Sequence, residues 1–152
     1  MNNVRKILCA TLILIMACAL YGCSKDVITG EQFKEKIQEQ GFVVDSSSDY
    51  IMDNATEGFR AIKDGSSMIV TFWTFSSDEE AVAAYDKMYN PSQSEDQELP
   101  GTVLEGDNFT KYTVESLDDY SLLSRVGNTL LFAGGDLSEK DTIKEVAESI
   151  GY

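Results

Sequence analysis

Residues 68–75, Met-Ile-Val-Thr-Phe-Trp-Thr-Phe, predict the central strand of a β-sheet. Successive side chains of a strand point to opposite faces, so the apolar residues of this stretch divide between both faces of the sheet. Such a strand is either covered on both faces or leaves an exposed aromatic patch, and large exposed patches mark interaction sites. We expect Trp73 to pack in the core, with an exposed recognition role as the alternative.

The segments on either side of this strand predict a hairpin and a helix. An apolar run at 57–63 precedes it, and Asp64-Gly65 between two such runs is a strong turn signal. Ser77-Asp78-Glu79-Glu80 then predicts a helix start with a capping box and acidic residues in the first turn. An apolar stripe continues to Tyr89, and Asn90-Pro91 ends the helix.

The second half of the chain repeats this order of elements. Residues 109–115 predict a strand, and the runs 120–126 and 129–133 flank a tight turn at Gly127-Asn128. A helix beginning at Ser138 follows, because apolar residues recur there at helical spacing. The order suggests two hairpin-plus-helix half-repeats, which should superpose with their helices on one face of the sheet.

The remaining segments predict one short helix, one short strand and two acidic polar stretches. Thr29 and Gln32 form a capping box for a helix over 30–40, and 42–44 is a strand candidate. Residues 45–57 carry an acidic residue every fourth position, which predicts a loop because like charges at this spacing destabilise a helix. A calcium site in this loop is the alternative, although the alternating calcium-loop pattern is absent. Residues 91–101 predict an acidic surface connector.

Together these elements predict a single α+β domain over residues 30–152. We expect a mostly antiparallel sheet of about five strands with three helices packed on one face. The opposite face is the candidate recognition surface. Its candidate binding residues are Trp73, Tyr112 and Arg125, and Thr71, Thr110 and Ser121 could line the same face.

The N-terminus carries a processing pattern. Arg5 and Lys6 precede fourteen largely apolar residues, 7–20, which are fewer than the roughly 20 that a membrane-spanning helix needs. The segment ends in Leu20-Tyr21-Gly22-Cys23. It resembles the lipobox of bacterial lipoproteins, which Leu20, Gly22 and Cys23 match.

The lipobox resemblance implies how the mature chain is held. Residues 1–22 are removed as a signal peptide, and Cys23 receives diacylglyceryl and fatty acyl groups such as palmitate. The protein would then sit at the outer face of the cytoplasmic membrane, or at the outer membrane of a Gram-negative cell, with 23–29 as a short tether. An ordinary secreted protein whose signal ends in cysteine is the alternative.

Cysteine usage agrees with lipidation. The chain has three cysteines, of which Cys9 and Cys18 lie in the removed segment. Cys23 is therefore the sole mature cysteine, and acylation accounts for an odd cysteine in an exported protein. Two acyl chains anchor a protein stably where one holds it weakly.

The net charge of the mature chain limits the kinds of partner that it can bind. Without residues 1–22 the chain keeps 130 residues, with 10 basic against 26 acidic residues, a net charge of −16. This charge repels nucleic acid, which is bound through basic patches, and anionic headgroups alike. It favours a soluble monomer whose membrane contact comes from the lipid.

The missing residue types restrict the chemistry. The sequence has no histidine, and acylation would leave no free cysteine, which removes histidine bases, cysteine nucleophiles and nearly every zinc site. We expect no metal, no cofactor and no enzymatic activity, with a carboxylate or Ser-Lys hydrolase as a minor alternative. The expected function is a non-enzymatic interaction domain acting on an envelope partner. A small-ligand or cation-binding lipoprotein is the alternative.

Overall fold

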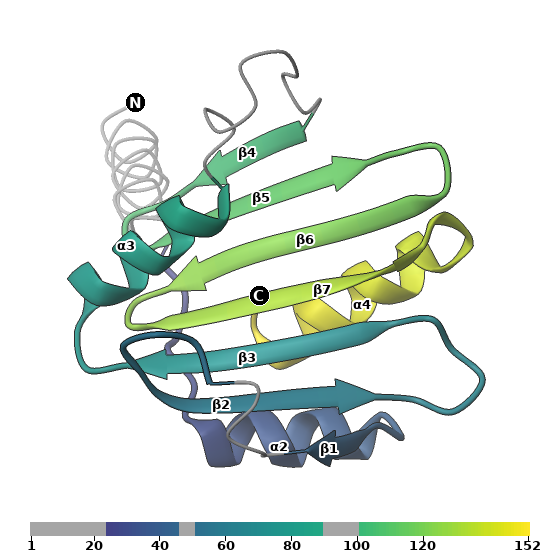
Figure 1. The fold of residues 1–152 in the computed structure, drawn as a ribbon, viewed down its shortest axis with the longest axis horizontal. Coiled ribbons are helices and arrows are strands. Elements are labelled where there is room, and N and C mark those ends of the chain that lie inside the picture. Colours follow the sequence, from purple (N-terminus) through teal and green to yellow (C-terminus); the bar gives the residue numbers. More distant parts are fainter. Residues whose placement is uncertain (1–23, 46–50, 90–100) are drawn as a thin grey trace, which may run out of the picture.

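Seven antiparallel strands form one sheet in the order β1-β2-β3-β7-β6-β5-β4 (Figure 1). This computed structural model describes residues 24–45, 51–89 and 101–152. The predicted lipidation site Cys23, residues 46–50 of the acidic loop and residues 91–100 of the connector lie outside the described residues. The strands are β1 (Val43–Asp45), β2 (Ala55–Ile62), β3 (Ile69–Phe75), β4 (Gly101–Glu105), β5 (Phe109–Glu115), β6 (Asp119–Val126) and β7 (Thr129–Asp136).

The central position of β3 is confirmed. It pairs with β2 on one side and with β7 on the other, so it joins the two predicted hairpins into one sheet. Both hairpin turns contain a glycine with a left-handed backbone, Gly65 at φ 74° and Gly127 at φ 53°.

The sheet has more strands than the five or so that we expected. The strand without any sequence signal is β4, a sheet edge in which all five residues are exposed. Because neither of its faces is buried, its sequence shows no apolar alternation. The acidic 45–57 stretch is also shorter as a loop than predicted, since β2 already begins at Ala55.

The three α-helices of the described residues do not share one face of the sheet, so that prediction was wrong. Helices α2 (Gly30–Glu39) and α4 (Lys140–Ile150) pack on one face, and α3 (Asp78–Tyr89) packs on the other (Figure 1). The cause lies in β3, whose Val70 and Phe72 face α2 and α4 while Trp73 and Phe75 face α3. The result is a three-layer α/β/α arrangement.

The half-repeat hypothesis fails for the same reason. Helix α3 follows the β2–β3 hairpin and α4 follows the β6–β7 hairpin, but the two helices lie on opposite faces of the sheet. When the β2–β3 hairpin is superposed on the β6–β7 hairpin, α3 therefore cannot lie on the same face as α4.

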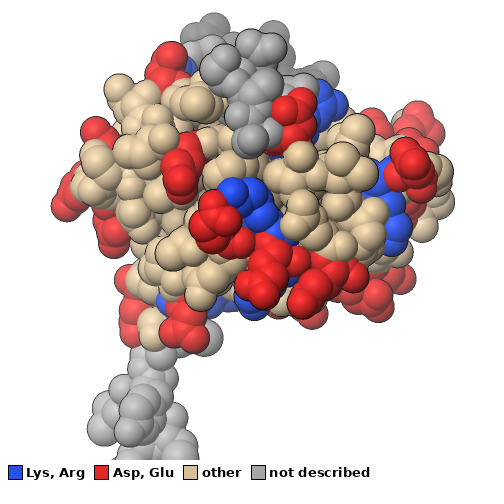
Figure 2. All heavy atoms as spheres, turned by 90° about the horizontal axis from the view of Figure 1, so that it is seen from below, with Lys and Arg blue, Asp and Glu red and all other residues tan. Residues whose placement is uncertain are grey.

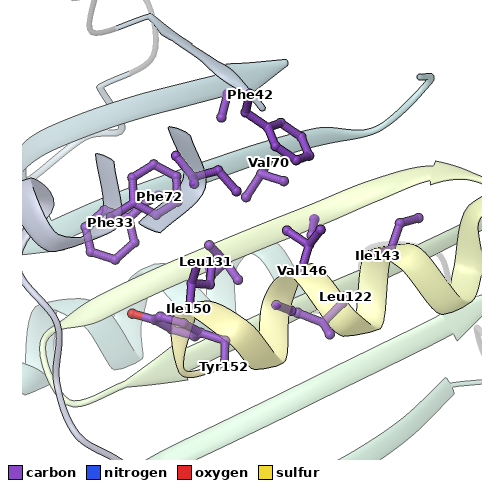
Figure 3. Packing of buried hydrophobic residues seen from close by; sticks show 14 of the residues in the cluster. Phe33, Phe42, Val70, Phe72, Leu122, Leu131, Ile143, Val146, Ile150 and Tyr152 are labelled. Atoms are coloured by element: carbon purple, nitrogen blue, oxygen red, sulfur yellow. The ribbon is translucent and has the colours of Figure 1, made fainter. Parts of the chain in front are cut away.

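The larger core lies between the sheet and the α2 and α4 helices (Figure 3). Phe33 of α2 is fully buried and stacks on Phe72 of β3, with ring centroids 4.7 Å apart. Ile143, Val146 and Ile150 of α4 project onto β6 and β7. This core covers one face of the sheet, and α3 covers only part of the other.

Side-chain capping interactions define where the helices begin. The capping box of Thr29 and Gln32 at α2 is confirmed. At α3 the Glu80 backbone N–H donates to the Ser77 hydroxyl at 3.3 Å, and the Glu80 carboxylate accepts from the backbone N–H of Ser76 at 3.2 Å. A short 3-10 turn, Leu137–Glu139, leads into α4.

Candidate functional site

A groove lies between α3 and the strands β4, β5 and β6, on the face of the sheet that α3 covers only in part. It consists of two recesses of about 400 Å³ and 390 Å³, which adjoin because Val82 and Arg125 line both. We call it the α3 groove. It is lined by Asp78, Glu79, Val82, Tyr85, Asp86 and Tyr89 of α3 and by Val103, Glu105, Asp107, Asn108, Thr110 and Arg125 of the sheet.

Three tyrosines form a continuous aromatic row at one end of the groove. The rings of Tyr85 and Tyr89 have centroids 5.7 Å apart, and the Tyr89 ring meets Tyr112 of β5 edge-on at 4.6 Å. Burial, and then the neighbouring Tyr89, raise the pKa of the Tyr112 hydroxyl. The row connects the C-terminal end of α3 to the sheet and gives the groove a rigid apolar wall.

Arg125 lies where the two recesses meet. This partly buried β6 residue donates from Nη1 to the backbone carbonyl of Gly127 at 3.1 Å. Within the described ranges, no carboxylate lies within ion-pair distance of its guanidinium. A guanidinium has five N–H donors, so several remain for a partner.

The hydroxyl of Tyr85 is buried without a hydrogen-bond partner in the described part of the chain. Tyr85 is 5% exposed, and burial, followed by Tyr89, Asp86 and Glu105, raises the pKa of its hydroxyl to about 12, while Arg125 acts in the opposite direction. A buried polar group without a partner costs about 1–3 kcal/mol. The hydroxyl lies beneath the surface of the recess that Tyr85 lines.

The groove is acidic. Asp86 and Glu105 line one recess and Asp78, Glu79 and Asp107 the other, against the single cation Arg125. The pKa of Glu79 is lowered by a backbone N–H and the Ser77 hydroxyl, which favour its charged form. Away from the groove, Figure 2 shows acidic side chains spread over the face on the β1 side, with Lys and Arg among them.

The structure separates the three candidate binding residues predicted from the sequence. Trp73 is 8% exposed and packs in the smaller core beneath α3, so its interpretation as a core residue is confirmed. Arg125 lines the groove, and Tyr112 adjoins it through Tyr89. Thr110 also lines it, whereas Thr71 is buried.

Sequence reasoning missed Tyr85, Asp86 and Glu105. Tyr85 falls within the apolar stripe that the sequence predicts up to Tyr89, and Asp86 follows it without any motif of its own. Glu105 belongs to β4, which had no signal. One signal in the sequence could have indicated the site. Tyr85 and Tyr89 place hydroxyl groups on the apolar face of the helix, and a buried tyrosine hydroxyl usually has a hydrogen-bond partner.

The described residues offer neither a metal cluster nor a membrane-spanning helix. They contain no group of three or more Asp, Glu, Cys or His placed to hold a metal ion. None of their helices has the length and apolarity needed to cross a membrane.

Comparisons with known proteins give the following. No protein-family model matches the sequence, and no curated protein matches it. Among solved structures, the chain is similar to a GTP binding regulator from Thermotoga maritima, with 13% identity and a TM-score of 0.49. The similarity covers 82% of this chain and 85% of the other. A similarity at this level does not indicate a shared function.

Proposed function

We propose that the mature chain is a membrane-anchored extracytoplasmic lipoprotein, and that it acts as a non-enzymatic interaction domain whose α3 groove binds an envelope partner. The observation that carries the proposal is the α3 groove itself, where five carboxylates line two adjoining recesses around Arg125, whose guanidinium makes no ion pair with the described residues. The lipobox-like sequence ending in Cys23 supports the anchor, and the absence of histidine from the sequence supports a binding role.

The chemistry of the groove favours a partner segment that carries basic side chains. Five carboxylates surround one guanidinium, so the summed potential attracts cations and speeds their encounter. Val82 and Val103, which are 39% and 42% exposed, offer apolar contact at the rim. A partner backbone carbonyl or carboxylate would accept from Arg125.

In-cell photocross-linking tests the proposal. A photoreactive phenylalanine analogue replaces Val82 in the groove. Val43 serves as the matched control, because it is an exposed valine in β1, the edge strand at the other end of the strand order from β4. We expect one dominant membrane-associated adduct from position 82 and none from position 43. The adduct should be lost when Arg125→Ala is combined with the probe.

Two results would contradict the proposal that the protein is an interaction domain. Adducts of equal yield from positions 82 and 43 would show non-specific contact, and the absence of any adduct at position 82 would remove the groove as the contact site. The anchor has its own test, because Cys23→Ala should move the protein from the membrane to the soluble fraction or leave an uncleaved precursor.

A small-ligand-binding lipoprotein is the second candidate, favoured by the size of the recess. Ligand pockets commonly measure about 300–1,000 Å³, and the recess beside Tyr85 has about 400 Å³. A thermal-shift screen of amino acids, amines and short peptides would find a ligand. Tyr85→Phe should then reduce the shift, whereas Ser116→Ala, far from the groove, should preserve it.

A further inference from the structure

The segment that follows the lipidation site is attached to the folded domain. The backbone N–H of Lys25 donates to Oδ1 of Asn108 at 2.8 Å, and Nδ2 of Asn108 donates to the backbone carbonyl of Lys25 at 2.7 Å. Three residues later Ile28 is 7% exposed and belongs to the larger core. Residues 25–28 are thus not a free linker, although the sequence suggested a tether over 23–29.

This attachment leaves very little chain between the lipid and the domain. Cys23 precedes Lys25 by two residues, and an extended chain covers at most about 3.6 Å per residue, so the two Cα atoms lie within about 7 Å. A lipid anchor on Cys23 would therefore be separated from the Lys25–Asn108 attachment by a single residue.

Asn108 belongs to one particular end of the sheet, which we call the near end. The backbone N–H of Gly127 donates to the Asn108 carbonyl at 2.8 Å, and the backbone N–H of Phe75 donates to the Asn128 carbonyl at 2.9 Å. The near end thus gathers the β4–β5 and β6–β7 turns and the start of α3, on the left of Figure 1. The turns at 63–68 and 116–118 lie at the far end, on the right.

We propose that the acylated protein rests on the bilayer in one orientation, with the near end toward the lipid and the far end toward the aqueous phase. This rests on the lipid anchor of the proposed function. Strands of seven or eight residues are about 25 Å long, so the far end stands that much further from the headgroups.

The orientation also places the groove. Asp78, Asp107 and Asn108 line the recess that opens at the near end. A partner segment bound there lies next to the membrane, which suits the juxtamembrane part of a membrane protein. The acidic residues give no attraction to anionic headgroups, so the acyl chains and the Lys25–Asn108 attachment set the orientation.

Site-specific quenching on vesicles tests the orientation. The acylated full-length mature protein is reconstituted into phosphatidylcholine vesicles containing a headgroup nitroxide lipid. A fluorophore is attached to Asp107→Cys at the near end or to Leu117→Cys at the far end, which is 94% exposed. Acylation blocks Cys23, so the introduced thiol is the only one labelled. We expect several-fold stronger quenching at position 107 than at 117.

A second experiment removes the hydrogen bonds between Asn108 and Lys25. Asn108→Ala removes both hydrogen bonds to Lys25 while Ile28 stays in the core, so the ratio of quenching at 107 to that at 117 should fall. Ser116→Ala is the matched control, because it removes a turn hydrogen bond from the Asp119 backbone N–H, 3.0 Å long, at the far end. That variant should keep the ratio of the unaltered protein.

The outcomes distinguish the orientation from the anchor. Equal quenching at both positions overturns the proposed orientation while the anchor stands. A ratio that Asn108→Ala leaves unchanged overturns the role of the Lys25–Asn108 attachment in setting the orientation. A mature protein that lacks acyl chains and does not bind the vesicles overturns the anchor, and the orientation with it.

Discussion

The hydroxyl of Tyr152 hydrogen-bonds to the hydroxyl of Thr129 in the interior, where both residues are 1% exposed. The Thr129 hydroxyl donates its own hydrogen to the carbonyl of Val126 at 2.7 Å. Tyr152 must therefore be the donor between the two hydroxyls, because a hydroxyl has a single hydrogen to give. The bond connects the segment after α4 to the first residue of β7 and satisfies a phenol that packs against Phe72.

Removing the donor and removing the acceptor of this bond should have different costs. Tyr152→Phe loses one hydrogen bond and leaves Thr129 bonded to Val126, so we expect a loss of about 1 kcal/mol of unfolding free energy. Thr129→Val leaves the Tyr152 hydroxyl buried without an acceptor, which should cost about 1–3 kcal/mol. Urea unfolding of the soluble Cys23→Ala protein measures both. A Thr129→Val variant as stable as Tyr152→Phe would show that the phenol finds another acceptor.

Trp73 should behave as a core residue. It is the single tryptophan of the chain and packs in the cluster beneath α3, so its fluorescence should shift to the red only when the protein unfolds. Trp73→Ala should lower the unfolding free energy by about 3–5 kcal/mol, because a large buried ring leaves a cavity. Val43→Ala, at a residue 65% exposed, should change it by less than about 0.5 kcal/mol. Similar small effects of both substitutions would mean that Trp73 is a surface contact.

The sequence predicted the elements whose residues are buried in a regular pattern. The two hairpins followed from turn glycines between apolar runs, and α2 followed from its cap at Thr29. The exposed edge strand β4 could not be predicted, because no burial imposes alternation on its residues. The face of the sheet on which α3 packs could not be predicted either. A helix that follows a hairpin can pack on either face, and β3 has apolar residues on both of its faces.

The candidate site was predictable in part for a related reason. Arg125 and Tyr112 were named because both lie in predicted strands and could line one face of the sheet. The remaining groove residues come from α3 and β4, whose positions depend on long-range packing. The attachment of Lys25 to Asn108 spans 83 positions in sequence, and no local pattern connects two such residues.

Tyr85 should make stability depend on alkaline pH. Its folded-state pKa of about 12 exceeds the ordinary value of 10, so between these pH values the unfolded chain loses the proton first. The folded state then binds more protons, and stability falls as the pH rises from 10 to 12. Urea unfolding across this range should show a shallower fall for Tyr85→Phe. Some slope should persist, because burial also raises the pKa of Tyr112, Tyr120 and Tyr152.

At neutral pH the same substitution tests whether the Tyr85 hydroxyl is truly without a partner. Tyr85→Phe removes a buried group that makes no hydrogen bond among the described residues, so stability should be unchanged or should rise by as much as about 1–3 kcal/mol. A loss greater than about 1 kcal/mol would reveal a hydrogen-bond partner for this hydroxyl.

The two turn glycines provide a matched pair that probes the N-terminal segment. Gly65 and Gly127 both have left-handed backbones, so alanine at either should cost about 1 kcal/mol of backbone strain. An added Cβ at Gly65 meets nothing within 4 Å, whereas at Gly127 it would lie 2.5 Å from Cγ2 of Val27. Gly127→Ala should therefore be the more destabilising substitution.

A double-mutant cycle identifies the origin of the difference between these glycines. With Val27→Ala in the background, Gly127→Ala should cost no more than Gly65→Ala, with a coupling of about 1 kcal/mol between positions 27 and 127. Urea unfolding of the four variants of the cycle, and of Gly65→Ala with and without Val27→Ala, gives the comparison. Equal costs of Gly127→Ala in both backgrounds would mean that residue 27 does not pack on this turn, and the segment leading to Cys23 would then be held by Lys25 and Ile28 alone.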